Sequence, residues 1–121
     1  MKRRDMDILN HIIGYGEDIQ RTMARFGADK SVFETDRDYR NSVCMSLLQI
    51  GELAGHLSDD YREATKSTMY WPAIKGMRNL IVHDYGATDI DKVWTTMTED
   101  LPDLLNFCRE QVEQTQSNSD H

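Results

Sequence analysis

Apolar residues recur at intervals of three and four along most of this 121-residue chain, and that spacing constrains its fold more than any other feature. Between residues 5 and 26 the recurring residues are Ile8, Ile12, Tyr15, Ile19, Met23 and Phe26. Between residues 36 and 57 they are Val43, Leu47, Ile50, Ala54 and Leu57. Stripes of this kind are the buried faces of amphipathic helices. No stretch alternates polar and apolar residues as a half-buried strand does, so the sequence predicts an all-α fold.

Turn residues divide this pattern into four main helices. The first is predicted over 5–26, where Gly27 can adopt the left-handed backbone that commonly ends a helix. The second is predicted over 36–57, after a short helical turn that begins at Ser31. Another short turn is expected over 61–67, after the polar break that follows residue 57.

The last two helices begin at recognisable signals. Trp71-Pro72 opens the third, because proline is harmless in a first turn, and this helix should end near 84–86. Thr88-Asp-Ile-Asp91 is typical of the capped start of a fourth helix, which Pro102 should kink or divide in two. The chain beyond residue 113 is polar, so we expect one helical domain over 1–113 and a frayed tail over 114–121.

Length and composition indicate a single domain that folds in water. With 121 residues, 39% of them hydrophobic and 29% charged, the chain can build one core but not two. No apolar run reaches the ~20 residues that a membrane span needs, and no apolar segment follows the basic N-terminus as in a signal peptide. Cys44 and Cys108 are isolated thiols of the kind that pack in cytosolic proteins. We therefore expect a cytoplasmic protein that does not enter membranes.

The charge is acidic overall but basic in one window. A net charge of −7 argues against a general nucleic-acid binder, which would normally be basic. Between residues 61 and 83, however, the only acidic side chain is Glu63, and the basic ones are Arg62, Lys66, Lys75 and Arg78. This distribution is compatible with a small, focused site for an anion.

That basic window leads into the segment from Lys75 to Gly86, where Arg78, His83 and Tyr85 form an Arg-x4-His-x-Tyr arrangement. At ~100° per helical residue, one face of this segment contains Lys75, Gly76, Arg78, Asn79, Val82 and His83. The opposite face, which should contact the core, contains Ile74, Met77, Leu80 and Ile81. A face that is part cationic and part apolar suggests an interface with a second copy of the same helix.

The polar residues of this face have complementary chemistry. Arg78 offers a planar, permanently charged donor group suited to phosphate, and His83 can exchange protons near neutral pH. Asn79 can orient either group. Because no cluster of acidic residues and histidines has metal-ligand spacing, we expect no metal or other cofactor. One histidine cannot easily serve as both base and acid at one phosphodiester, whereas two copies facing each other could divide these roles.

The Arg-x4-His strip and Glu52 each also have an interpretation that involves no function. An Arg-x4-His pair on a helix often occurs by chance, so the strip could be an ordinary polar surface. Glu52, which interrupts the apolar face of the second helix, is expected to be a solvated or paired carboxylate, with support of a site as the alternative.

The segment Arg78-Asn-Leu-Ile-Val-His-Asp-Tyr85 resembles the signature of HEPN domains, specifically the HepT-like toxin family. The resemblance extends over most of the chain. The other segments that carry it are Ile50-Gly-Glu-Leu53, Tyr70-Trp-Pro-Ala-Ile-Lys-Gly-Met-Arg-Asn79, Asp89-Ile-Asp-Lys-Val-Trp94 and Asp100-Leu-Pro-Asp-Leu104.

This resemblance implies an antiparallel bundle of four to five helices that dimerises through the signature-helix face, so that two signature helices form one cleft. It also implies a metal-independent ribonuclease, a toxin in which the RNA 2′-hydroxyl attacks the adjacent phosphate. His83 would move protons and Arg78 would stabilise the charge on the phosphoryl oxygens, with Asn79 and Lys75 supporting the site.

The family's usual partner is a minimal nucleotidyltransferase that acts as an antitoxin and transfers AMP onto the motif tyrosine, which is Tyr85 here. Each AMP would add negative charge and bulk beside a site meant for RNA phosphate. The alternative is a catalytically inactive HEPN module that binds a nucleotidyltransferase or a nucleotide, and the acidic net charge agrees with it. A third possibility is a plain helical dimer without a site.

Overall fold

The computed structural model describes residues 1–82 and 89–119, with only the backbone described for 80–82 and 118–119. Every regular element within these ranges is helical, which confirms the predicted all-α class. The helices longer than eight residues are α1 (Arg3–Phe26), α3 (Arg37–Gly55), α5 (Trp71–Val82) and α7 (Leu101–Ser119). The shorter ones are α2 (Lys30–Thr35), α4 (Asp59–Thr65) and α6 (Ile90–Thr95).

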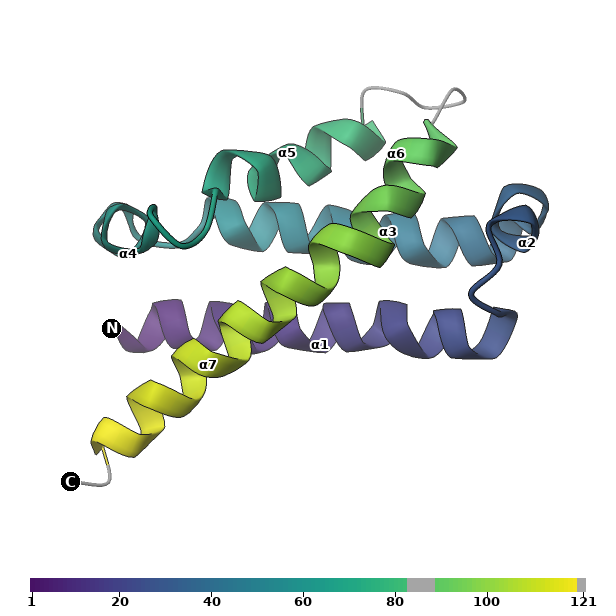
Figure 1. Ribbon diagram of the computed structural model, residues 1–121. Helices are drawn as coiled ribbons and strands as arrows, with labels where there is room; N and C mark the ends of the chain where they lie inside the picture. Colours follow the sequence, from purple (N-terminus) through teal and green to yellow (C-terminus); the bar gives the residue numbers. More distant parts are fainter. Residues whose placement is uncertain (83–88, 120–121) are drawn as a thin grey trace.

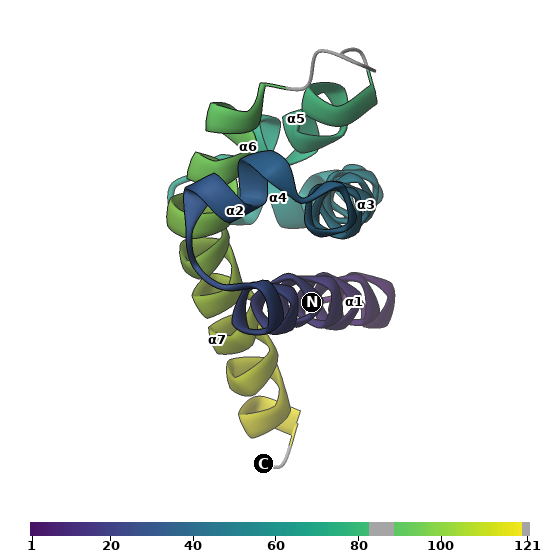
Figure 2. The ribbon, with the colours of Figure 1, turned by 90° about the vertical axis from the view of Figure 1, so that its right-hand side faces the viewer.

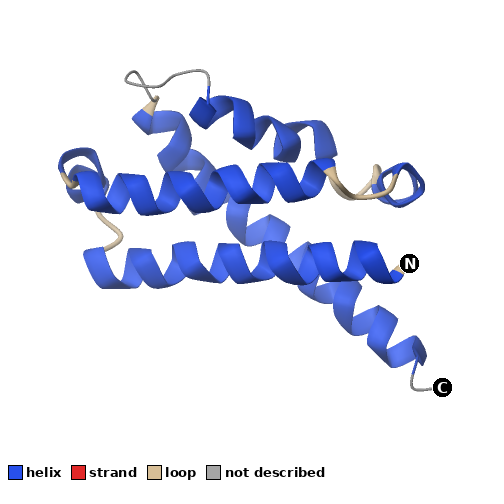
Figure 3. Cartoon of the chain, turned by 180° about the vertical axis from the view of Figure 1, so that it is seen from behind, coloured by secondary structure: helices blue, strands red, loops and turns tan. Residues whose placement is uncertain are grey.

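The long helices lie in layers. α3 runs antiparallel to α1 and contacts it along much of its length, and α5 packs on the opposite side of α3 (Figure 1). α7 crosses this stack obliquely and packs against α1 (Figure 2). Seen from behind, α1, α3 and α5 form three successive levels, with α2 in the connection between α1 and α3 and α4 in the connection between α3 and α5 (Figure 3). In this arrangement α5 is an outer helix, and α3 is the main surface that supports it.

The core follows the stripes that the sequence predicts. All five of the stripe residues predicted for the second helix are buried in α3 or just after it, and Ile8, Ile12 and Ile19 of α1 are buried with them. The other fully or nearly fully buried apolar residues are Leu9, Phe33, Tyr39, Tyr61, Trp71, Ile74, Met77, Val93, Met97, Leu101, Leu104, Leu105, Phe107, Cys108 and Val112. Burial raises the pKa of the Cys108 thiol to about 12, so this thiol stays neutral in the folded protein.

Short polar side chains begin several helices. Asp36 accepts a hydrogen bond from the backbone N–H of Tyr39 at the start of α3, and Asp89 accepts one from Lys92 at the start of α6. Asp89 therefore confirms the cap predicted between residues 88 and 91. Gly27, which follows α1, has φ 103°, a value that L side chains rarely adopt.

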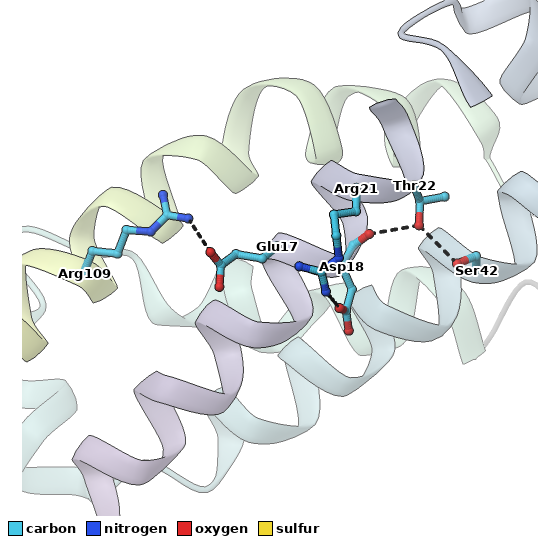
Figure 4. A network of polar contacts seen from close by, with 6 residues as sticks. All are labelled: Glu17, Asp18, Arg21, Thr22, Ser42 and Arg109. Atoms are coloured by element: carbon cyan, nitrogen blue, oxygen red, sulfur yellow. Dashed lines mark hydrogen bonds and ion pairs between the residues drawn. The ribbon is translucent and has the colours of Figure 1, made fainter. Parts of the chain in front are cut away.

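Buried and partly buried polar contacts fix the helices relative to one another. Asp5 of α1 is 1% exposed and accepts hydrogen bonds from the backbone N–H (2.8 Å) and hydroxyl (2.6 Å) of Ser58, the capping residue of α4. Figure 4 shows a second set of contacts, in which Arg109 of α7 pairs with Glu17 of α1 at 3.5 Å. These contacts link α1 to α4 at one place and to α7 at another.

The structure refines the expected boundaries in two places. The predicted division at Pro102 is confirmed, and it takes the form of a π-helical segment, Thr96–Asp100, between α6 and α7. In this segment the Leu101 N–H donates to the Thr96 carbonyl five residues back. The polar segment from residue 114, expected to be a frayed tail, continues α7 as far as Ser119. The segment has glutamines and no proline or glycine, which explains why the helix continues.

None of the described helices is both long and apolar enough to cross a membrane.

Candidate functional site

An aromatic cluster anchors the start of α5. Trp71 is 3% exposed and donates a hydrogen bond from its indole N–H to the hydroxyl of Thr65 at 2.8 Å. Its ring lies 5.6 Å from that of Phe107 in an edge-to-face arrangement and 6.3 Å from that of Tyr61. Tyr61 in turn donates to the side-chain oxygen of Gln111, and burial raises the pKa of its phenol. The first turn of α5 is therefore held against both α4 and α7.

A glycine allows α5 to approach α3 closely. A methyl group on Gly51 would lie 2.7 Å from the backbone nitrogen of Arg78, closer than real contacts allow, and a tight 3.1 Å from its Cβ. One turn further along α3, the position that a methyl group would take on Gly55 is 3.8 Å from the Cε atom of Lys75. Gly51, which interrupts the apolar face of α3, thus marks the place where α5, the signature helix, crosses α3.

The close approach brings Arg78 and Glu52 together. The guanidinium Nε of Arg78 forms an ion pair with a carboxylate oxygen of Glu52, the residue that follows Gly51 on α3. The two side chains are 53% and 41% exposed, so the pair is open to solvent and the rest of the guanidinium can reach another anion. Glu52 is therefore a paired and partly exposed carboxylate, which is the first of the two roles that the sequence allowed, and its support of a site stays a prediction.

Arg78 and Glu52 line a groove of about 1110 Å³ between α3, α4 and α5. Its lining includes Gly51 and Gly55 of α3 and Lys75 and Asn79 of α5. The other lining residues are His56, Asp59, Arg62, Glu63, Lys66, Met69, Tyr70, Trp71, Pro72 and Gly76. The structure therefore brings together three of the predicted site residues, Lys75, Arg78 and Asn79, on the open side of α5.

Two predicted residues cannot be placed in this groove. His83 and Tyr85 lie outside the described residues, as does the predicted end of the signature helix near 84–86. The core-facing stripe of this helix is confirmed for Ile74 and Met77, which are 6% and 4% exposed.

Sequence reasoning missed Tyr70 as a feature of the groove. Its side chain is 68% exposed, although it directly precedes the buried Trp71. In the sequence, Tyr70-Trp71-Pro72 contributes to the resemblance to HepT-like proteins only as part of the segment that precedes the Arg78 motif. An aromatic pair just before a helix-starting proline could have signalled one buried and one exposed ring, because successive residues there point in different directions.

A second groove of about 770 Å³ lies on the other side of α5, next to α6 and α7. Its polar lining is acidic: Lys92 is accompanied by Asp89, Asp91, Asp100 and Asp103. In neither groove, nor elsewhere in the described residues, do three or more histidine, cysteine, aspartate or glutamate side chains converge as metal ligands would.

The fold and the groove define an all-α domain whose outer helix presents an arginine, held by a carboxylate, at the edge of an open cationic groove. The family described as "Ribonuclease HepT-like" matches residues 12–111, and the chain belongs to this HepT-like family.

Curated relatives agree with this assignment. A protein of Methanocaldococcus jannaschii, provisionally named an RNase, is 29% identical over 112 residues, which cover 86% of this chain and 94% of the relative. A protein of Thermococcus cleftensis named "Probable ribonuclease HepT" is 28% identical over 72 residues, covering 60% of this chain and 64% of that protein. No solved structure matches the chain. The comparisons support ribonuclease activity at the level of the family.

Proposed function

We propose that this protein is a metal-independent endoribonuclease, the toxin of a toxin–antitoxin pair, that cleaves RNA in the cytoplasm. The observation that carries the proposal is the placement of Arg78 in a member of the HepT-like family. Its guanidinium is half-exposed, oriented by Glu52 and accompanied by Lys75 and Asn79 at the edge of one open groove. A guanidinium held in this orientation can bind a phosphate without first reorganising.

In the proposed reaction the 2′-oxygen of a ribose forms a bond to the adjacent phosphorus while the bond from phosphorus to the 5′-oxygen of the next nucleotide breaks. A base accepts the 2′-hydroxyl proton, and an acid donates a proton to the departing 5′-oxygen. The products are a 2′,3′-cyclic phosphate and a 5′-hydroxyl. We assign the proton transfers to His83 and the stabilisation of charge on the phosphoryl oxygens to Arg78. We assign Glu52 the part of a positioning residue, because its carboxylate pairs with the Arg78 guanidinium.

We further propose that the active form is a homodimer with the signature helices at its centre. The exposure of α5 supports this, since Pro72, Ala73, Lys75 and Asn79 are all exposed on it. A methyl group added to Gly76, also on this helix, would meet no atom within 4 Å, so a second helix can approach it closely. Two copies of His83 would then supply one base and one acid.

A minimal nucleotidyltransferase is the proposed antitoxin, and Tyr85 is its proposed AMP acceptor. The physical reason is that Tyr85 follows His83 by two residues, so an added AMP would carry negative charge next to the groove that binds RNA phosphate.

The second candidate function is a catalytically inactive HEPN module that binds a nucleotidyltransferase or a nucleotide. The net charge of −7 favours it, because most of the molecular surface would repel RNA. This candidate predicts a stable complex with the transferase and no RNA cleavage by the purified protein.

Cleavage of single-stranded RNA by the purified protein distinguishes the two candidates. We expect His83→Ala to lower the rate by about 10²–10⁴-fold, the usual contribution of a general acid–base residue. His11→Ala is the matched control, since His11 is an exposed histidine of α1 that lines neither groove. Undiminished cleavage by His83→Ala would remove the role assigned to that residue, and absence of cleavage by the unaltered protein would favour the inactive module.

A further inference from the structure

The groove between α3, α4 and α5 continues well beyond Arg78, toward the start of α5 and onto α4. We propose that this extension is a binding track for the single-stranded RNA that flanks the cleaved phosphate, in which Tyr70 stacks on a base and Lys66 and Arg62 contact the backbone. The proposal rests on the ribonuclease function above and adds a substrate class and contact residues to it.

The charged side chains that line the groove favour the binding of RNA. Its lining contains four permanently basic side chains, Arg62, Lys66, Lys75 and Arg78, against the acidic Glu52, Asp59 and Glu63. The groove on the other side of α5 has one basic side chain and four acidic ones. A polyanion is therefore favoured in the first groove and repelled from the second. This contrast explains how a chain with a net charge of −7 can still have a place for RNA.

The basic groups are also available to phosphate. Lys66 pairs with Glu63 at 2.5 Å, but both side chains are about two-thirds exposed (68% and 70%). Arg62 pairs in the same way with Asp59; the Arg62 side chain is 21% exposed and that of Asp59 is 96% exposed, so Arg62 is the less accessible of these two basic groups. Exposed ion pairs between residues three apart on one helix contribute little to stability. The basic side chain can therefore exchange the carboxylate for a phosphate. Lys75 forms no ion pair with any described residue, and its Cε lies 3.8 Å from the position that a methyl group would take on Gly55, another lining residue of the groove.

Tyr70 supplies the argument for a single strand. Its ring is 68% exposed where the two grooves meet, since Tyr70 lines both of them, and it directly precedes the buried Trp71. Bases stack on such aromatic side chains only when they are unpaired, which is why this contact is typical of single-strand binding. From Trp71 to Arg78, α5 rises by about 10 Å, the length of about three stacked nucleotides.

The test is binding of an oligonucleotide that cannot be cleaved, a single-stranded RNA with 2′-O-methyl groups at every position, measured by fluorescence anisotropy with the full-length protein. We expect Tyr70→Ala to raise the Kd about 5- to 100-fold, the effect of losing one stacked base. Tyr70→Phe should bind like the unaltered protein, because it keeps the ring. Lys66→Ala should weaken binding and lower the slope of log Kd against log salt by about 0.7, the value for one phosphate contact on a single strand.

Two matched controls come from elsewhere on the surface. Lys92→Ala removes an exposed lysine from the acidic groove, and Met45→Ala removes an exposed apolar side chain of α3 that lines neither groove. Neither should weaken RNA binding. The track would be disproved if Tyr70→Ala and Lys66→Ala bound as tightly as the controls, or if the unaltered protein failed to bind the oligonucleotide.

Other outcomes separate the track from the ribonuclease function. If the unaltered protein cuts ordinary RNA but the groove variants bind normally, the track is wrong and the ribonuclease stands. If binding depends on Tyr70 and Lys66 but ordinary RNA stays intact, the track stands and catalysis does not. Loss of nucleotidyltransferase binding without any loss of RNA binding in these variants would reassign the groove to a protein partner and overturn the proposal.

Discussion

Replacing Gly51 with alanine tests whether the contact between α3 and α5 holds the site. The added methyl would lie 2.7 Å from the backbone nitrogen of Arg78, 0.7 Å inside the 3.4 Å at which ordinary contact begins. Since the opposing atoms belong to the backbone of α5, no side-chain rotation relieves the clash, and the helix itself has to move. Overpacking of this kind costs about 1–3 kcal/mol, whereas the gain in helix propensity from Gly to Ala is about 0.5–1 kcal/mol.

The difference between the two terms predicts that Gly51→Ala lowers the free energy of unfolding by about 0–2.5 kcal/mol, measured by urea denaturation. The matched control is Gly14→Ala in α1, where an added methyl meets no atom within 4 Å, so it should stabilise by about 0.5–1 kcal/mol. Because displacement of α5 also separates Arg78 from Glu52, Gly51→Ala should lose RNA cleavage while Gly14→Ala keeps it. A Gly51→Ala protein as stable as Gly14→Ala would refute the reasoning about this contact.

Two further predictions concern the fold and the regulation of the site. Asp5→Ala removes the acceptor of both Ser58 hydrogen bonds, so it should lower the free energy of unfolding by about 1.5–3 kcal/mol in urea denaturation. Its control is Asp7→Ala, which removes an exposed carboxylate of the same helix. Equal losses of stability in the two variants would contradict the role of the buried carboxylate. Co-expression with the nucleotidyltransferase should add AMP mass increments that Tyr85→Phe abolishes and Tyr70→Phe retains, whereas continued modification of Tyr85→Phe would place the AMP on another residue.

The sequence was sufficient for the fold class because helical periodicity is a local property. The stripe predicted in α3 is buried throughout, whereas in α1 Ile8, Ile12 and Ile19 are buried and the other predicted members, Tyr15, Met23 and Phe26, are partly buried against the core. Asp89 and Gly27 act as the predicted start and end signals. The π-helical form of the break before Pro102 was not predictable, since proline marks where an α-helical bond is lost but not how the chain compensates. The continuation of α7 to Ser119 was missed because polarity was given more weight than helix propensity.

The site was only partly predictable, because it depends on contacts between helices. The helical wheel placed Lys75, Arg78 and Asn79 on one exposed face, and the structure confirms that they share a groove. Neither the wheel nor the spacing could pair Arg78 with Glu52, because register between two helices is set by packing. Gly51 was the available signal, since a glycine within an apolar stripe often marks close approach of another backbone.

The ends of the cleaved RNA test the central claim most directly. Purified protein is incubated with single-stranded RNA in the presence of a metal chelator, and the products are identified by mass spectrometry. The proposed attack by the 2′-hydroxyl predicts a 2′,3′-cyclic phosphate and a 5′-hydroxyl, no cleavage where the attacking ribose is replaced by 2′-deoxyribose, and a rate reduced about 10²–10³-fold by Arg78→Ala. Products with a 5′-phosphate and a 3′-hydroxyl, or cleavage unaffected by Arg78→Ala, would contradict it.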